Sequence, residues 1–291
     1  MLREIAEIEA RRFRMVGSAN LTLADMLELA AEISRLSAAG IDGVVVTQGT
    51  DTLEETSYAL DLLLPPGVRV VVTGAMRNPG LPGEDGPANL VAAVRLAASA
   101  EALGLGVLVV LDDTIHLARF VRKTHATATG AFTSARVGPI GYMVEDRVRL
   151  LLQPRHPSRH FAVAPRDDLP DVALLTLSLG NDERLIDSVA PAGYRGLVIE
   201  AFGAGHVAER TLPRLEKLAR RMPVVFATRT GSGELFRSTG TYPGSEGDLM
   251  ARGLIPAVGL DGRKARILLT LLLATDTPPA EMASAFENAS L

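Results

Sequence analysis

The sequence predicts an α/β protein with two doubly wound domains, the larger at the N-terminus and the smaller at the C-terminus. Short apolar runs that end in small or polar residues alternate with segments of helical periodicity, which is typical of a mostly parallel sheet covered by helices on both faces. A polar, proline-containing stretch interrupts this alternation about halfway along the chain. The 47% apolar content of the 291 residues is enough to bury two cores.

In the first domain, expected strands alternate with expected helices. The strands span residues 43–47, 68–73 and 107–111, and the helices span residues 53–64 and 87–103. From residue 136 to residue 152 the pattern changes to short alternating pieces, which predict a hairpin at the edge of this sheet. The first domain is therefore expected to cover residues 1–152.

The polar stretch 153–170 is expected to link the domains, and the second domain covers residues 171–291. The longest apolar run, 267–274, is too short to span a bilayer and is interpreted as part of a buried helix that starts near Asp261. The other expected elements of this smaller parallel sheet are strands at 172–177, 196–201 and 223–227, with helices from about Asp182 and Glu209.

Composition narrows the classes of function. The 30 basic residues are outnumbered by 34 acidic ones and form no long basic run, so neither a nucleic-acid partner nor a membrane partner is expected. The lack of cysteine excludes disulfides, thiolate catalysis and cysteine-bound zinc. The first residues do not resemble a signal peptide, so the sequence as written predicts a cytoplasmic protein; a lost N-terminal signal would make it periplasmic.

The segment that carries chemistry follows the first predicted strand. Thr50, Asp51 and Thr52 lie where strand 43–47 passes through a turn into a helix. Thr52 and Glu55 have capping-box spacing, so Thr52 is expected to cap that helix. Thr50 and Asp51 have no such structural role, and ligands of doubly wound sheets bind at the carboxyl ends of the strands. These two residues are therefore candidate functional residues.

The string Gly49-Thr50-Asp51-Thr52, followed by Glu54-Glu55-Thr56, resembles a signature of the L-asparaginase family. The chain is similar to this family over nearly its whole length, and the family implies the two-domain α/β fold. The further similar motifs, in chain order, are Thr73-Gly74-Ala75-Met76-Arg77, Asp85-Gly86-Pro87-Ala88-Asn89-Leu90, residues 106–113, Arg122-Lys123-Thr124, residues 138–142 and residues 262–266.

The resemblance implies that Thr50, Asp51 and Lys123 form a catalytic triad of hydroxyl, carboxylate and amine. A threonine hydroxyl is a poor nucleophile unless a neighbouring base accepts its proton, and a partly desolvated lysine amine can do so. Asp51 would orient Lys123 and also hold the α-amino group of the substrate. Without the family pattern, Lys123 would be interpreted as a solvated surface lysine.

The resemblance also implies a set of substrate-binding residues. Ser18 matches a position that binds the substrate α-carboxylate, although Ser18, Asn20 or Thr22 could equally cap the next helix. The backbone carbonyl of Ala75 would meet the side-chain amide, and Glu246 would reach the substrate amine of a neighbouring subunit. The complete expected set is Ser18, Gly49, Thr50, Asp51, Ala75, His206 and Glu246.

The resemblance therefore implies an enzyme that hydrolyses L-asparagine to L-aspartate and ammonia through a threonine nucleophile, with neither a metal nor an organic cofactor. L-Glutamine is the alternative substrate, because one methylene is worth only about 1–3 kcal/mol in a binding pocket. The implied assembly is a homotetramer built as a dimer of dimers.

The sequence departs from the family pattern at two positions and at its start. Gln48 replaces the usual His and His206 the usual Asn; both keep hydrogen-bonding capacity, so they bear on substrate preference and rate. The family's first strand and its Thr-Gly-Gly-Thr-Ile motif, which usually supplies the nucleophile, do not occur, and Met1 aligns with the helical stretch that follows them. A late start assignment and a true truncation both explain this, and a truncation would impair activity.

Three competing interpretations stay open. The string Gly203-Ala204-Gly205-His206-Val207-Ala208 fits the Gly-x-Gly-x-x-Ala dinucleotide fingerprint, but no acidic residue follows a second strand to hold a ribose. His156 and His160 could be metal ligands but have no nearby carboxylate partner. The alternative function is non-catalytic: a family member that binds an amino acid, or stabilises a related subunit, without turnover.

Overall fold

The computed structural model describes residues 2–154 and 159–289. The chain divides into two compact units, Met1–Arg166 and Asp167–Leu291, and each contains its own sheet. The predicted α/β class, with a larger sheet in the N-terminal unit and a smaller parallel sheet in the C-terminal unit, is confirmed. The domain boundaries expected at residues 152 and 171 stay a prediction.

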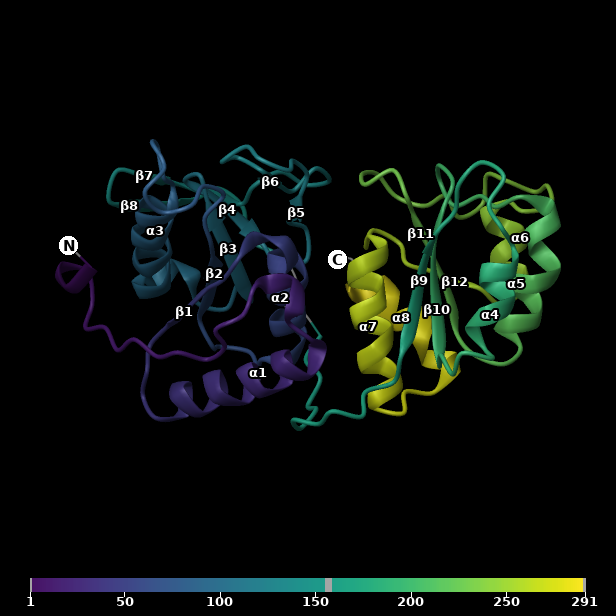
Figure 1. Ribbon diagram of the computed structural model, residues 1–291, viewed down its shortest axis with the longest axis horizontal. Coiled ribbons are helices and arrows are strands. Elements are labelled where there is room, and N and C mark those ends of the chain that lie inside the picture. The colour runs from purple at the N-terminus through teal and green to yellow at the C-terminus, as the bar shows by residue number, and fades with distance from the viewer. Residues whose placement is uncertain (1, 155–158, 290–291) are drawn as a thin grey trace. The chain divides into compact units, whose positions relative to one another are not determined.

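The sheet of the first unit is formed, in order across it, by β1 (Val44–Thr47), β2 (Val70–Thr73), β3 (Val107–Leu111), β4 (Thr114–Leu117), β7 (Gly141–Val144) and β8 (Arg147–Leu150) (Figure 1). β1, β2 and β3 pair in parallel, and the pairs from β3 onward are antiparallel. β2 and β3 are buried along their whole length, which explains their continuous apolar sequence. The predicted edge hairpin is confirmed as β7 and β8.

The sequence pattern did not predict β4. This strand follows β3 through a tight turn at Asp112 and Asp113, both of which have positive φ (51° and 55°). Two successive positive φ angles are typical of hairpin turns, for which Asn-Gly is the usual sequence signal. Aspartate tolerates the left-handed backbone better than most residues do, so this turn forms without glycine.

Helices cover both faces of this sheet: α1 (Leu23–Ala38), α2 (Leu53–Leu63) and α3 (Gly86–Ala98). α3 packs on one face, and α2, backed by α1, packs on the other (Figure 1). Successive side chains of a strand point to opposite faces, so Val71, Leu108 and Val110 pack against Ala93 and Leu96 of α3. The unit also contains short 3-10 helices η1 (Leu2–Glu4), η2 (Ser18–Asn20), η3 (Thr50–Thr52) and η4 (Ala100–Ala102), and a ribbon of β5 (Arg122–Lys123) and β6 (Phe132–Thr133).

Threonines occupy the N-cap positions of α1 and α2, but the two differ in whether the side chain caps the helix. Among the three candidates for the α1 cap, Thr22 takes the role: its side chain accepts from the Asp25 N–H, and its own N–H donates to the Asp25 carboxylate. Thr52 occupies the predicted N-cap position of α2, but it does not cap the helix with a side-chain hydrogen bond. The Thr52 hydroxyl donates to the backbone carbonyl of Ser18 (2.9 Å), and its side chain makes no cap bond.

Within the described residues, β1 pairs with β2 alone, so no strand lies along its other edge. Residues 7–16 belong to no helix or strand and form no backbone hydrogen bond with β1. An ion pair between Arg11 and Glu32 joins this segment to α1 instead (2.9 Å). Among the described residues before this segment, the single turn of η1 is the only helix.

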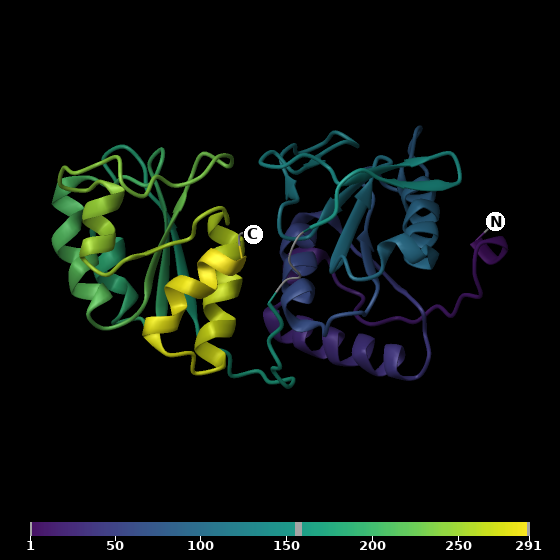
Figure 2. The same ribbon diagram turned by 180° about the vertical axis from the view of Figure 1, so that it is seen from behind.

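The sheet of the second unit is parallel, in the order β12 (Ile255–Pro256), β11 (Val224–Thr228), β10 (Gly196–Ala201) and β9 (Val172–Thr176). One face is covered by α4 (Arg184–Val189), α5 (Leu212–Ala219) and α6 (Glu246–Ala251), the other by α7 (Gly262–Ala274) and α8 (Pro279–Ala289) (Figure 2). η5 (Glu209–Thr211) precedes α5. The predicted buried helix is confirmed as α7, whose start Asp261 caps. No helix in the described part of the chain is long and apolar enough to cross a membrane.

Candidate active site

The loops at the carboxyl ends of β1 and β2 form a polar site in the first unit. After β1 the chain turns through Gly49 into η3 and then α2. A side-chain carbon at Gly74, just after β2, would lie 2.5 Å from the Gln48 carbonyl oxygen and 3.2 Å from Thr50 Cγ2. Glycine at position 74 therefore allows the two loops to approach closely.

Thr50, Asp51 and Lys123 meet at this site. Nζ of Lys123 lies 2.9 Å from Thr50 Oγ1 and 3.1 Å from Asp51 Oδ1, within hydrogen-bonding distance of both oxygens. The side chain of Lys123 is 18% exposed and that of Asp51 is 70% exposed, whereas Thr50 is buried. Lys123 is thus not a solvated surface lysine: its amine is held between a buried hydroxyl and a carboxylate that reaches the solvent.

Ser18 is buried against the same loop. Its Oγ accepts a hydrogen bond from the Asp51 N–H (3.2 Å), and its carbonyl accepts the Thr52 hydroxyl (2.9 Å). A side-chain carbon at Gly49 would lie 2.9 Å from Ser18 Oγ, so glycine permits this approach. The predicted residues Ser18, Gly49, Thr50, Asp51 and Lys123 are therefore brought together by the fold.

The loop that carries Ala75 is held by two side chains at the start of α3. The carboxylate oxygens of Asp85 accept from the backbone N–H groups of Met76 and Arg77, each at 2.9 Å. Nδ2 of Asn89 donates to the carbonyl that precedes Ala75, also at 2.9 Å. The sequence motif contained both residues, but their role in holding this loop was not predicted.

Asp85 is stabilised in its ionised form. Burial raises the pKa of Asp85, but the N–H groups of Met76 and Arg77 and the side chain of Asn89 outweigh burial and bring the pKa below its ordinary value of 3.8. Because folding lowers this pKa, ionised Asp85 stabilises the folded state above the ordinary value. That contribution is lost as the pH falls through the pKa of the folded state.

Substitution of Asp85 by Asn is expected to loosen the Ala75 loop, because an amide offers one carbonyl oxygen to two N–H donors. We expect the free energy of unfolding to fall by about 1–2 kcal/mol near pH 7. The difference from the unaltered protein should shrink as the pH falls below 3.8 and through the pKa of folded Asp85, because Asp85 itself then becomes protonated. Urea unfolding at pH 7 and at a series of pH values below 3.8 measures this, and a difference that stays constant over the whole series would contradict a role for the charge.

His206 and Glu246 lie together in the second unit. Nε2 of His206 is 3.4 Å from Glu246 Oε2, and the His206 and Tyr242 ring centroids are 5.7 Å apart. Oε1 of the fully buried Glu246 accepts from the N–H groups of Thr239 (2.8 Å) and Gly240 (2.6 Å). Burial raises the pKa of Glu246, but these N–H groups and His206 outweigh it and hold the pKa below its ordinary value of 4.5.

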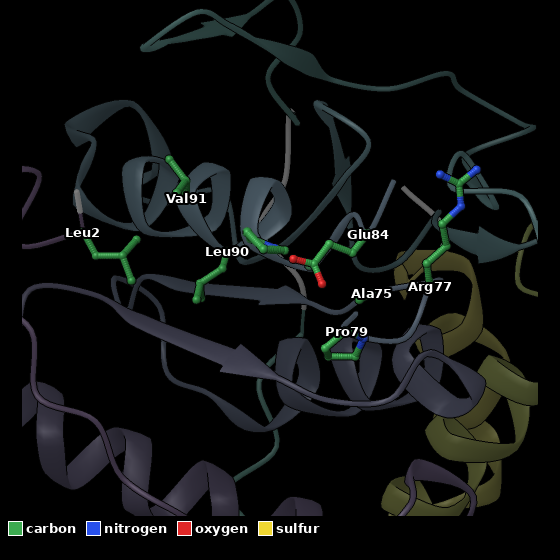
Figure 3. Close-up of a pocket in the computed structure, with 9 residues that line it drawn as sticks. Leu2, Ala75, Arg77, Pro79, Glu84, Leu90 and Val91 are labelled. Carbon is green, nitrogen blue, oxygen red and sulfur yellow. The ribbon is translucent and has the colours of Figure 1, made fainter. Parts of the chain in front are cut away.

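A pocket of about 400 Å³ lies beside the Ala75 loop (Figure 3). Ala75 and Arg77 line it from the loop, Leu90 and Val91 from α3, and Leu2 from η1. The triad residues are not part of this lining, and its side chains are largely apolar. An apolar pocket does not match a charged amino acid, so the polar site at Thr50 is the better candidate for binding one.

Two family models match the chain. Asparaginase, N-terminal, matches residues 1–156, and the glutaminase/asparaginase C-terminal domain matches residues 171–286. The chain belongs to the asparaginase family. The predicted family resemblance and the predicted enzyme class, an asparaginase-type amidohydrolase, are confirmed by this membership.

Individual members of the asparaginase family are similar over most of the chain. L-asparaginase 2 of Bacillus subtilis (strain 168) is 34% identical, over 99% of this chain and 76% of that protein. A probable L-asparaginase of Deinococcus radiodurans is 39% identical, over 88% of this chain and 78% of that protein. The crystal structure of a probable cytoplasmic L-asparaginase from Campylobacter jejuni matches with a TM-score of 0.91 and 33% identity, over 99% of this chain and 88% of that chain.

The scarcity of lysine in the sequence is a further indication of a role for Lys123, and the prediction of this residue did not use it. Of the 30 basic residues in this asparaginase-family chain, 27 are arginines and only Lys123, Lys217 and Lys264 are lysines. A lysine amine can release its proton and then accept another, whereas a guanidinium in a protein stays protonated. A chain that uses arginine almost everywhere favours a chemical role for a lysine placed beside a buried hydroxyl.

The structure also bears on the competing interpretations. The Gly-x-Gly-x-x-Ala string is not the strand-to-helix turn that dinucleotide binding requires, because His206 turns back to bridge Phe202 and the next α-helix begins at Leu212. His156 lies outside the described residues. Within residues 2–154 and 159–289, no three or more His, Cys, Asp or Glu side chains gather as a metal site would need.

Proposed function

We propose that this chain hydrolyses the side-chain amide of L-asparagine to L-aspartate and ammonia, with L-glutamine as the second candidate substrate. The observation that carries the proposal is the 2.9 Å contact between Lys123 Nζ and Thr50 Oγ1. Family membership supports the amide substrate, because the similar proteins from Bacillus subtilis and Escherichia coli are both named L-asparaginase 2.

The proposed chemistry begins at the Thr50 hydroxyl. Oγ1 attacks the carbonyl carbon of the substrate amide while the neutral amine of Lys123 takes the hydroxyl proton. The carbon–nitrogen bond breaks, and Lys123 returns the proton to the leaving nitrogen, which departs as ammonia. Water then cleaves the aspartyl ester, which restores the hydroxyl and releases L-aspartate. Asp51, 3.1 Å from Nζ, orients the amine throughout.

The charged end of the substrate has matching groups in the same loop. Ser18 Oγ already accepts from the Asp51 N–H, so its own hydrogen is available to a substrate α-carboxylate. The exposed Asp51 carboxylate can bind the α-ammonium group, and the N-terminus of α2 favours negative charge nearby. Gly49 leaves room for Ser18 to lie against this loop, and the Ala75 backbone carbonyl would accept a hydrogen bond from the side-chain amide of the substrate.

We further propose a homotetramer built as a dimer of dimers, in which Glu246 and His206 serve the site of a neighbouring subunit. Support comes from Glu246, whose Oε1 is fixed by two backbone N–H groups while Oε2 faces His206. A carboxylate held so firmly is suited to binding a substrate ammonium group. A mass of four chains by sedimentation equilibrium is the expected result, and a monomer would contradict this assembly.

The proposed activity is tested on the purified, unaltered protein. Ammonia release from L-asparagine and from L-glutamine is measured with a coupled assay, alongside the melting temperature with each amino acid present. We expect L-asparagine to release ammonia at the higher kcat/KM. A rise in melting temperature without ammonia release would contradict the proposal and support the non-catalytic alternative.

A further inference from the structure

A buried carboxylate lies beneath the proposed triad. Glu54 belongs to the first turn of α2 and is only 2% exposed. Its Oε2 accepts a hydrogen bond from the backbone N–H of Lys123. Burying a carboxylate is costly unless hydrogen bonds compensate it, and an apolar residue would fill such a position at a lower cost. The bond to Lys123 therefore indicates a specific role for this side chain.

Lys123 lies on a short ribbon that needs outside support. β5 and β6 contain two residues each, and Lys123 is opposite Phe132. Two strands of this length are not stable by themselves. Beyond the paired residues, the Thr124 N–H donates to the Ala131 carbonyl (2.8 Å). The Lys123 N–H is directed to Glu54 instead, so this bond ties the ribbon to α2.

The 3-10 turn immediately before this helix carries the partners of the Lys123 amine. Thr50 and Asp51 lie in η3, and η3 leads directly into α2, where Glu54 is the second residue. The short segment 50–54 therefore holds Lys123 at two points. Glu54 binds its backbone N–H, and Thr50 and Asp51 bind its Nζ. Fixing the backbone limits how far the flexible lysine side chain can carry its amine away from Oγ1.

We propose that Glu54 is a positioning residue that sets the distance between the Lys123 amine and the Thr50 hydroxyl. The proposal rests on the proposed function of the same site and extends it to a residue that does not touch the substrate. The position of the Glu54 carboxylate oxygen is what matters, because this oxygen must reach the Lys123 N–H. Its negative charge strengthens that hydrogen bond but is secondary to its reach.

Two substitutions separate reach from charge. Glu54→Gln keeps an acceptor oxygen at the same reach and removes the charge, whereas Glu54→Asp keeps the charge and withdraws both oxygens by one methylene. Ser57→Ala is the matched control, since Ser57 is buried on the same helix and its hydroxyl donates to the backbone carbonyl of Glu54 (3.1 Å), not to its side chain. We expect Glu54→Asp to lower kcat by about 100-fold, because a displacement near 1 Å has that effect.

Glu54→Gln should retain at least ten times the kcat of Glu54→Asp, because the Gln variant only weakens one hydrogen bond. The KM of both variants should stay close to that of the unaltered protein. Ser57→Ala should leave kcat unchanged. Equal kcat values for the Gln and Asp variants, or a higher kcat for Asp, would overturn the assignment, because a merely electrostatic role favours Asp. A change confined to KM would overturn it as well.

Hydrogen exchange at the Lys123 amide tests the tether without any need for turnover. We expect this amide to exchange faster in Glu54→Asp than in Glu54→Gln or Ser57→Ala, while amides of β2 exchange equally in all three. Unchanged exchange at Lys123 overturns the proposal whether or not ammonia is released. Faster exchange in a protein that releases no ammonia would support the tether and contradict the proposed function alone.

Discussion

Replacement of Lys123 by Met or by Arg is expected to lower turnover of L-asparagine by about 10²–10⁴-fold, the contribution typical of a positioned general base. Met removes the amine that lies 2.9 Å from Thr50 Oγ1. Arg keeps a positive charge and hydrogen-bond donors but cannot take up the hydroxyl proton. The Arg variant therefore separates proton transfer from charge.

Steady-state ammonia release measures both Lys123 variants, with Lys217→Arg as the control. Lys217 is an exposed lysine of α5 in the second unit, so the same exchange there should leave turnover unchanged. Near-normal turnover in Lys123→Arg would mean that the amine serves only as a charge. Near-normal turnover in Lys123→Met would remove Lys123 from the mechanism.

The second large effect is expected at Glu246. Glu246→Leu removes the carboxylate that accepts from the N–H groups of Thr239 and Gly240, and we expect the unfolding free energy to fall by about 1–3 kcal/mol. Glu246→Gln keeps a carbonyl oxygen for both donors and should remain more stable than the Leu variant. It removes the charge, however, so under the proposed role we expect KM for L-asparagine to rise by about 10- to 100-fold.

Chemical denaturation and steady-state kinetics test this pair of effects, with the exposed Glu209→Gln as the control. Folding lowers the pKa of Glu246 from its ordinary value of 4.5, so its ionised form stabilises the protein above that value. The advantage over Glu246→Gln should disappear as the pH falls through the folded-state pKa. An unchanged KM in Glu246→Gln would contradict the proposed contact of Glu246 with the substrate, even if the variant is less stable to denaturation.

The parallel strands could be predicted because strands buried on both faces need apolar residues at every position. β2 and β3 are buried on both faces and are therefore continuous apolar runs. β4 could not be predicted in the same way, since the turn before it uses Asp112 and Asp113 rather than glycine. The N-cap position of Thr52 in α2 was predicted, but its capping hydrogen bond does not form, because local spacing cannot show that the Ser18 carbonyl, 34 residues away, competes for the Thr52 hydroxyl.

The location of the candidate site could be predicted from a strand, a loop and a helix, which place Thr50 and Asp51 at the carboxyl end of β1. The contact with Lys123 joins residues 73 apart, so the sequence indicated it only through family resemblance. Glu54 could not be identified as a support, because a glutamate in the first turn of a helix is ordinary in itself. Its role depends on the Lys123 backbone, which only the tertiary fold brings near.

The proposed hydrolysis depends above all on the hydroxyl of Thr50, and ammonia release from L-asparagine by Thr50→Val and Thr50→Ser tests this role most directly. Val has nearly the shape of Thr but no hydroxyl to give its proton to Lys123, whereas Ser keeps the hydroxyl. We predict a loss of about 10²–10⁴-fold in kcat/KM for Val and retention of much of the activity by Ser. Near-normal turnover in Thr50→Val would contradict the account.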